Sequence, residues 1–336
     1  MNRSEHYSVI KIFVPLLVVL GHAARMYTGA GVVTPAVPSA FLARLSEILY
    51  SFHMALFMTV TGAVYSYCRE NGKYRSPLEL IRKKTVRLFV PYLFIGLLNV
   101  APVMCLLGFT EESYPAYCLH GILLVGNSRH LWFVFVLFLI FLLCAPLGDK
   151  LGKINFYLAA AVLFVCALLS PHLPTVFQIG NLFYYALFFF LGYRADRVYD
   201  RVIRVLGKPY VLLLLFAVWA VLSAVNRTFA IILRAAAGTA LFAGLTSFLP
   251  GKLPKNPILA RAGKNGFGIY LFHPMILYVL FDLLGAYPIP APVLCFGVTA
   301  ASYLLSFALT ELFRAIGCGF VIGEPMKKEH RNNRAQ

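Results

Sequence analysis

Ten apolar runs set the main constraint on how this 336-residue chain can fold. A helix needs about 20 mostly apolar residues to cross the hydrocarbon core of a bilayer, so ten such helices would use about 200 positions. The connections are short and polar, with Pro and Gly at several of them, and they leave no room for a soluble domain. The runs cover residues 9–28, 47–66, 87–108, 131–148, 154–170, 178–193, 209–225, 229–249, 266–285 and 291–313.

The composition agrees with a membrane protein. Hydrophobic residues make up 60% of the chain and charged residues 13%, whereas a soluble domain carries roughly 25% charged residues. This balance excludes a disordered chain and a coiled coil. Seven scattered cysteines without a C-x-x-C motif indicate neither a disulfide framework nor a zinc site, and we interpret them as buried apolar thiols. The sequence therefore predicts an all-α polytopic integral membrane protein with about ten transmembrane helices.

The distribution of lysine and arginine predicts the orientation. If the ten runs cross the membrane in turn, 24 of the 30 Lys and Arg residues lie on one side, and the four on the other side are Arg25, Arg44, Arg129 and Arg227. Because cytoplasmic loops carry the excess of positive charge, we expect both termini to be cytoplasmic. The basic residues lie in short connections rather than on one soluble face, so the net charge of +17 does not indicate nucleic-acid binding.

The domain organisation follows from the same pattern. We predict a single membrane domain over residues 1–323, and a basic cytoplasmic tail over residues 324–336 that is disordered. In an alternative reading, residues 1–24 form a cleaved signal peptide and nine spans remain. In either case no segment is large enough for a separate catalytic domain, so any chemistry has to occur among the helices.

Two ionisable residues share the first run. From Lys11 to His22, eleven helical steps rotate by about 1100°, about 20° from three full turns, and rise by about 16.5 Å. Both side chains therefore project from one face, with Lys11 near the cytoplasmic end and His22 toward the outer end. Charged and polar residues at this depth indicate a polar cavity. The alternatives are that Lys11 extends to the interface and that His22 is a hydrogen-bonded packing residue.

A second histidine, His53, opens the second run from the outer side. His22 and His53 can then face the same cavity from neighbouring antiparallel helices. No carboxylate stands at ligand spacing beside them, so we expect no metal site. General-base work needs only one imidazole near its working pH, and we interpret both histidines as catalytic candidates.

Further basic and polar residues lie at the membrane surface or at membrane depth. The basic segment 82–87 contains Lys84 and Arg87, and it is either a positive-inside anchor or a phosphate-binding patch. Trp132 is either an interfacial anchor or a surface on which a sugar ring stacks. We expect the polar residues of the later runs to face inward and to contribute to substrate binding. These substrate-binding candidates are His130, Trp132, Asn181, Tyr184, Arg234 and His273.

The ordered set of motifs resembles the acyltransferase-3 family of integral membrane O-acyltransferases. Most members have an arginine separated from the first histidine by ten residues, and a branch similar to the fucose 4-O-acetylases has a lysine there, as in this chain. The resemblance spans about residues 8–273. The motifs are Lys11-x10-His22, Val18-Val19-Leu20-Gly21-His22, Phe52-His53-Met54-Ala55-Leu56-Phe57, Thr61-Gly62, Arg87-Leu88-Phe89-Val90-Pro91-Tyr92, His130-Leu131-Trp132-Phe133 and Tyr270-Leu271-Phe272-His273.

The resemblance implies an activity and an acyl donor. Family members move an acyl group, usually acetyl, from cytoplasmic acyl-CoA to a carbohydrate hydroxyl. By this resemblance Lys11, Lys84 and Arg87 would bind the coenzyme phosphates, and no metal would take part. His22 would act as general base and His53 would orient it or stabilise the oxyanion, with either direct transfer or an acyl-histidine intermediate. The expected acceptor is a surface polysaccharide or a lipid-linked glycan, and the expected location is a bacterial inner membrane.

A secondary transporter of a small polar solute is the main alternative. The loop Asp149-Lys150-Leu151-Gly152-Lys153 partly resembles a loop of major facilitator transporters, but it follows the fourth run here, and the two halves of the chain show no repeat. A glycosyltransferase is disfavoured because the few outer acidic residues are dispersed.

Overall fold

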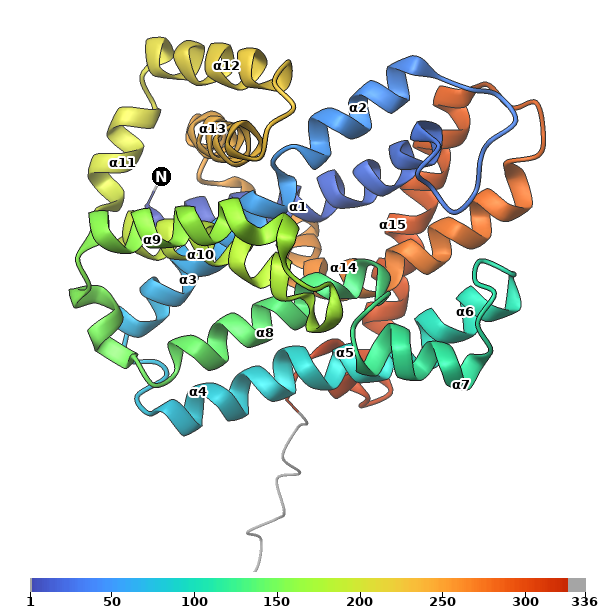
Figure 1. Ribbon diagram of the computed structural model, residues 1–336, viewed down its shortest axis with the longest axis horizontal. Coiled ribbons are helices and arrows are strands. Elements are labelled where there is room, and N and C mark those ends of the chain that lie inside the picture. The colour runs from blue at the N-terminus through green and yellow to red at the C-terminus, as the bar shows by residue number, and fades with distance from the viewer. Residues whose placement is uncertain (1, 326–336) are drawn as a thin grey trace, which may run out of the picture.

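The computed structural model describes residues 2–325, and every regular element in this range is a helix (Figure 1). The all-α prediction is therefore confirmed. The seven cysteines, all in this range, are free thiols. Of the predicted tail, only Glu324 and Pro325 are described, and residues 326–336 lie outside the described residues.

Each of the ten predicted runs contains a helix, but the helices differ in length. Besides seven helices of membrane-span length, one further candidate span is bent by 80° between α11 (Tyr199–Leu206) and α12 (Pro209–Ser223). Two runs form shorter apolar helices, Arg129–Cys144 and Phe156–His172. The polytopic architecture is confirmed, whereas the count of ten spans stays a prediction. Seven helices in the described chain are long and apolar enough to cross a membrane: Arg3–Thr28, Ala40–Glu70, Pro77–Leu106, Val176–Arg197, Thr228–Thr246, Pro257–Leu284 and Ala291–Ala315.

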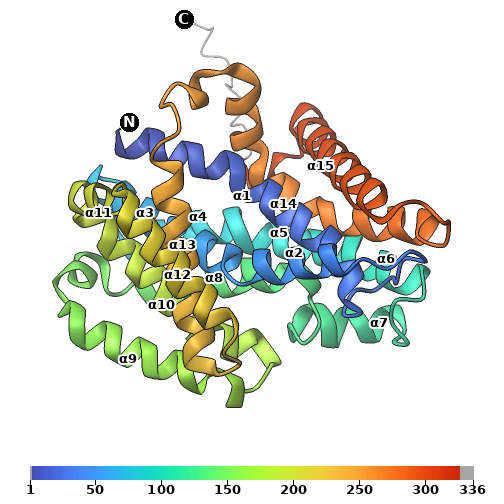
Figure 2. The ribbon, with the colours of Figure 1, turned by 90° about the horizontal axis from the view of Figure 1, so that it is seen from above.

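The first helix, α1 (Arg3–Arg25), runs through the middle of the bundle (Figures 1 and 2). It packs against α14 (Pro257–Leu284), α15 (Ala291–Ala315), α2 (Ala40–Tyr50) and α3 (His53–Glu70). Helices α11, α12 and α13 lie on one side of α1, and α14 and α15 lie on the other. The helix that carries Lys11 and His22 is therefore surrounded by the rest of the fold.

Local chemistry explains where α1 begins and how closely it packs. A capping box starts the helix, because the Asn2 side chain accepts a hydrogen bond from the Glu5 N–H and the Glu5 carboxylate accepts one from the Asn2 N–H. The helix continues through Pro15, which lacks the N–H that would bond the carbonyl of Lys11. A Cβ at Gly266 of α14 would lie 2.9 Å from the Pro15 ring, so glycine allows the two helices to approach here.

The second run differs from its predicted form. Instead of one helix over residues 47–66, α2 ends at Tyr50 and α3 begins at His53, and the two helices are joined at Ser51 and Phe52. The Ser51 hydroxyl donates to the carbonyl of Ile48 and accepts from the Trp219 indole N–H, at 2.7 and 3.0 Å. This break brings Tyr50 and His53 to the same region of the bundle, with ring centroids 4.7 Å apart.

The third span is a helix interrupted by two π-helical turns. Pro91 lacks the N–H that would bond the carbonyl of Arg87, and the π turn at residues 85–89 accommodates this loss. The turn lies at the basic segment that the sequence singled out, and π turns are frequent at functional sites. In chain order the elements are α4 (Pro77–Lys84), η2 (Thr85–Phe89), α5 (Val90–Ile95), η3 (Gly96–Val100) and α6 (Ala101–Leu106).

Ion pairs join segments that the charge count assigns to one side of the membrane. Arg3 contacts Glu70 at 2.8 Å and Asp196 at 3.5 Å. Lys255 contacts Glu5 at 3.7 Å, and Arg69 pairs with Asp149. Five predicted cytoplasmic segments thus gather at one end of the bundle.

The outside of the bundle is apolar, with Leu106 and Tyr157 more than 80% exposed, as expected for a surface that faces lipid.

Helices α3 and α10 (Ile179–Arg197) cross closely at two glycines. A Cβ at Gly62 would overlap the backbone carbonyl of Phe189, and a Cβ at Gly192 would overlap the carbonyl of Thr59. Neither carbonyl can move without moving its helix, so only glycine fits at this crossing.

We predict that Gly192→Ala destabilises the protein by about 1–3 kcal/mol, because the added methyl group forces the two helices apart. The measurement is the thermal unfolding temperature of the purified protein in detergent. Gly297→Ala in α15 is the matched control, since a Cβ there meets nothing within 4 Å. Equal unfolding temperatures for both variants would contradict the close crossing.

Candidate functional site

A cavity of about 390 Å³ lies among α1, α3, the η2 turn, α8 (Trp132–Cys144) and α14, and we call it the lysine cavity. Four cationic side chains line it, Lys11, Lys84, Arg87 and Lys264, and no Asp or Glu is among its lining residues. Three of these cations are the predicted donor-binding residues, which the fold brings together from two distant segments. A cavity that can admit water lowers the cost of cations within the bundle.

Aromatic rings form much of the remaining wall. The Lys84 ammonium lies 3.8 Å from the centroid of the Phe141 ring and 5.0 Å from that of Tyr74. Such cation–π contacts stabilise a partly buried ammonium without neutralising it. Among the described residues no Asp or Glu lines the cavity beside Lys84, so an anionic ligand would not have to displace a carboxylate.

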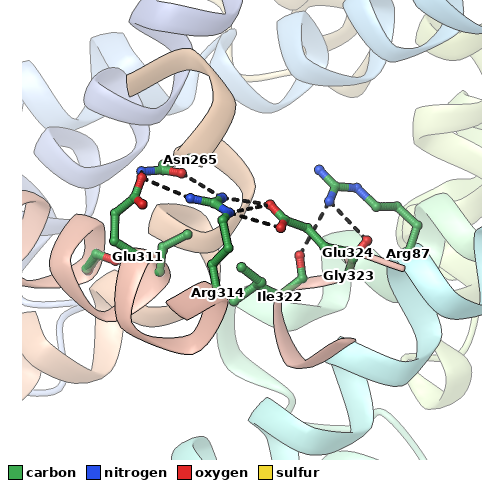
Figure 3. Close-up of polar contacts among 9 residues, drawn as sticks. Arg87, Asn265, Glu311, Arg314, Ile322, Gly323 and Glu324 are labelled. Carbon is green, nitrogen blue, oxygen red and sulfur yellow. Dashed lines mark hydrogen bonds and ion pairs between the residues drawn. The ribbon is translucent and has the colours of Figure 1, made fainter. Parts of the chain in front are cut away.

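Arg87 is held by the C-terminal segment (Figure 3). Its guanidinium donates to the carbonyls of Ile322 and Gly323, at 3.4 and 3.1 Å, and lies 4.6 Å from the Phe267 ring centroid. Gly323 has a φ of +71°, and a Cβ there would overlap the Arg87 carbonyl, so glycine allows this contact. The segment that the sequence assigned to the end of the domain thus packs against the rim of the lysine cavity.

An ion-pair network fixes the same segment to α14 and α15 (Figure 3). Arg314 pairs with Glu311 at 2.9 Å and with Glu324 at 2.6 Å, and it donates to Asn265 at 2.8 Å. The Arg314 hydrogen bonds hold the pKa of the Glu324 carboxyl below its usual value, so this group stays ionised at neutral pH. Glu324 therefore belongs to the ordered structure, whereas the sequence assigned it to a disordered tail.

A second cavity of about 300 Å³ lies near the C-terminal end of α1, beyond the part of the helix that lines the lysine cavity. We call it the histidine cavity. His22 and His130 line it together with Tyr50, Trp132 and two arginines. The Tyr50 hydroxyl and Nδ1 of His22 are hydrogen-bonded at 3.1 Å. Tyr50 is a contact of His22 that the sequence reasoning missed, although it lies only two residues before the motif that begins at Phe52.

Four histidines from four helices gather at this cavity. The ring centroids of His22 and His273 lie 5.1 Å apart, and those of His273 and His130 lie 5.7 Å apart. His53 packs against Tyr50 rather than directly against His22, so Tyr50 stands between the two catalytic candidates. His53 and His273 are fully buried behind the cavity wall.

The hydrogen bonds define the tautomers of three of these histidines. Nδ1 of His53 bonds the carbonyl of Leu49 at 2.6 Å, Nε2 of His130 bonds that of Leu271 at 3.0 Å, and Nδ1 of His273 bonds two carbonyls of α14. A carbonyl only accepts, so each bonded nitrogen carries a proton and the other nitrogen of the neutral ring presents a lone pair. Within the described chain these second nitrogens are buried without a hydrogen-bond partner. The cluster around His22 can therefore accept a proton.

The described chain holds no group of three His, Cys, Asp or Glu residues that is arranged to bind a metal ion. The four histidines do not converge on one point, because three of them are turned toward backbone carbonyls.

A layer of four apolar and aromatic residues separates the two cavities. The layer residues are Val18 of α1, Phe57 of α3, Phe133 of α8 and Tyr270 of α14. Along each of these chain segments, the layer residue lies between a residue that lines the lysine cavity and a histidine of the cluster. The rings of Phe57, Phe133 and Tyr270 contact one another with centroids 4.8 to 6.1 Å apart, and Val18 of α1 is fully buried. The sequence reasoning expected one continuous aqueous slot from Lys11 to His22, and that expectation is wrong for this structure, which has two cavities and a closed layer.

A third cavity of about 390 Å³ adjoins the histidine cavity, and we call it the arginine cavity. Arg234, Asn181 and Tyr184 line it, so three of the predicted substrate-binding residues lie together. The two cavities share Tyr50 and Gln178. Of the other three candidates, His130 and Trp132 line the histidine cavity, and His273 lies behind it.

A comparison with protein families finds a match over most of the chain. Residues 7–311 match the family model of the acyltransferase-3 family, described as an acyltransferase domain, so the chain belongs to this family of membrane acyltransferases. No curated protein and no solved structure matches the chain.

The two cavities should be reached from opposite sides of the membrane. We predict that Thr61→Cys in the lysine cavity reacts with a membrane-impermeant thiol reagent in inverted vesicles, and that Asn127→Cys in the histidine cavity reacts in spheroplasts. Labelling above that of the parent protein is measured by mass spectrometry. Reaction of both cysteines from the same side would contradict the closed layer.

Proposed function

We propose that the protein is an O-acyltransferase that moves an acyl group, most often acetyl, from cytoplasmic acyl-CoA to a hydroxyl of a surface polysaccharide or a lipid-linked glycan. The observation that carries the proposal is that α1 contributes Lys11 to the cationic cavity and His22 to the histidine cavity. The location we propose is the inner membrane of a bacterium, with the lysine cavity open to the cytoplasm.

The lysine cavity suits the charged end of acyl-CoA. Phosphates cannot enter an apolar bundle without compensation, and the cations of the cavity supply it. Lys11, Lys84 and Arg87 are the residues we assign to the donor, and Lys264 joins them because it lines the same cavity. The apolar part of the wall, from Val60 to Phe57 and Phe133, suits the uncharged arm that carries the thioester.

The thioester then has to pass the layer. Phe57 and Phe133 close the end of the lysine cavity nearest the histidines. Rotation of these rings would let the thioester reach the histidine cavity while the coenzyme phosphates stay with the cations. A layer that is closed without substrate also keeps water away from the thioester and prevents leakage across the membrane.

His22 is the residue to which we assign the proton transfer. In this assignment His22 Nδ1–H donates to the Tyr50 hydroxyl, so Nε2 presents its lone pair to the acceptor hydroxyl. As the acceptor oxygen forms a bond to the thioester carbonyl carbon, His22 takes its proton. The carbon–sulfur bond breaks, and the departing coenzyme sulfur takes that proton, which yields the ester and the free thiol. His53 and Tyr50 act as positioning residues.

The acceptor sugar would bind in the histidine cavity. Trp132 lines this cavity, and an aromatic ring of this kind is a surface on which a sugar stacks. The Trp132 ring also packs against Tyr185, with centroids 5.1 Å apart, which holds the indole in place.

We predict that His22→Ala lowers acyl transfer by about 10²–10⁴-fold, because the general base is lost. Cells without the protein are complemented with wild type or variant, and the acyl substituents of their surface glycans are measured by NMR and mass spectrometry. His172→Ala is the matched control, since this exposed histidine lines none of the three cavities. A wild-type acyl content in the His22→Ala strain would refute the assignment, and transport of an unmodified solute would favour the transporter.

A second prediction concerns donor binding. Lys84→Gln should raise the KM for acetyl-CoA about tenfold, because a charge-assisted contact to a phosphate is lost, and should leave the KM for the uncharged donor acetylpantetheine unchanged. Lys83→Gln is the control, since Lys83 is exposed and pairs with Glu79. Equal effects on both donors would show that Lys84 does not bind the phosphates.

A further inference from the structure

Three arginines surround the histidine cavity and the arginine cavity. Arg25 and Arg129 line the first cavity, and Arg234 lines the second. Neither cavity has an Asp or Glu among its lining residues. Together they form a cationic region beside His22, on the side where the charge count finds few basic residues.

These arginines are unexpected at this position in a membrane protein. Basic residues are depleted on the outer side, and a cation within a span costs about 2.5–3.5 kcal/mol in insertion experiments. Of the remaining outer arginines, Arg44 pairs with Glu47 at 2.6 Å and Arg227 is exposed. Arg25, Arg129 and Arg234 have no carboxylate within ion-pair distance in the part of the chain that the structure describes.

The guanidinium groups also have unused donors. Nε of Arg129 and Nε of Arg234 are buried without a hydrogen-bond partner among the described residues. Arg129 donates one bond, to the carbonyl of Phe109 at 3.4 Å. The Arg25 guanidinium lies 4.8 Å from the Tyr50 ring centroid. Buried donors of this kind are rare without a partner, which indicates a ligand that supplies the acceptors.

The loops beside these arginines are strained. Four non-glycine residues there have positive φ, Val125 at 57°, Arg129 at 50°, Phe177 at 53° and Gln178 at 54°. The two loops are joined by hydrogen bonds, and the Gln178 side chain donates to the carbonyl of Val125 at 2.7 Å. Strained backbone of this kind persists where the surrounding structure holds it and clusters at binding sites.

We propose that Arg25, Arg129 and Arg234 bind an anionic group, a phosphate or a carboxylate, on the acceptor glycan. The inference rests on the proposed function and specifies the acceptor class. Tyr50 lines both cavities and bonds His22, so a ligand whose charge lies at the arginines brings a neighbouring hydroxyl to the general base. A guanidinium suits this ligand because its paired N–H groups match two oxygens of a carboxylate or phosphate.

The acceptor is then either an acidic sugar or a sugar on a lipid phosphate. A neutral free sugar lacks the charge that this region needs and binds weakly. The requirement for an anionic acceptor also explains how the histidine cavity uses a glycan hydroxyl in preference to water. Binding of the anion at the arginines positions that hydroxyl beside the general base.

The test is a binding measurement on the full-length protein in nanodiscs, with radiolabelled pyrophosphate, glucuronate and glucose as probes. Wild-type protein should bind at least one of the two anions and not glucose. Arg129→Gln and Arg234→Gln should each weaken that binding about tenfold, since a charged hydrogen-bond partner is lost. Arg227→Gln, a change at an exposed outer arginine, should leave this binding intact.

The probes separate the two sources of charge. Only the binding that is lost in the Arg129→Gln and Arg234→Gln variants counts as binding at this site, because the lysine cavity also suits phosphates. Such binding for pyrophosphate alone indicates a lipid-linked phosphate, and such binding for glucuronate alone indicates an acidic sugar. Arg129→Lys and Arg234→Lys serve as second variants that keep the charge, and they should retain part of the binding. Anion binding that is equal in wild type and the Gln variants, or binding of glucose as tight as that of glucuronate, would overturn the proposal.

The measurement needs no acyl donor, so it is independent of the reaction. Anion binding by the arginines with no acyl transfer would refute the proposed function and leave this site intact. Acyl transfer without anion binding would refute the arginine site and leave the proposed function intact.

Discussion

A cation inside a bilayer is stable only where water, a counter-charge or a ligand reaches it, and this requirement organises the structure. Lys11, Lys84 and Arg87 lie deep in the bundle, and a cavity opens beside them. Arg25 and Arg129 occur toward the other side, and a second cavity opens there. Helix α1 connects the two regions, because its geometry aligns Lys11 with His22.

The layer between the cavities reconciles membrane integrity with transfer. A permanent slot with charges at one end and histidines at the other would conduct water and ions. The mutual contacts of Phe57, Phe133 and Tyr270 close the slot, and the Tyr270 hydroxyl donates to the carbonyl of His130, which couples the layer to the histidine cluster. In the proposed function, movement of this layer is the step that joins donor and acceptor.

The sequence predicted what periodicity and charge control. Apolar runs of membrane length gave the helices, and helical spacing put Lys11 and His22 on one face. The sequence did not predict the break at Ser51 and Phe52, because the hydrogen bond that Ser51 accepts from Trp219 is a tertiary contact. Tyr50 and the aromatic layer were missed for the same reason, since an aromatic residue in an apolar run has the pattern of ordinary core. Only the structure could show that Arg25 and Arg129 have no carboxylate partner among the described residues.

The central claim is that the acyl group of a cytoplasmic donor reaches the histidine cavity through the layer. A photoreactive acyl-CoA with a diazirine on the acyl chain, added to inverted vesicles and analysed by mass spectrometry of the crosslinked peptides, tests it most directly. The account predicts crosslinks at the layer residues Phe57 and Phe133 and at residues of the histidine cavity such as Tyr50 and Trp132, all suppressed by excess acetyl-CoA. Crosslinks confined to the outer rim of the lysine cavity or to lipid-facing helices such as α9 (Phe156–Leu169) would contradict it.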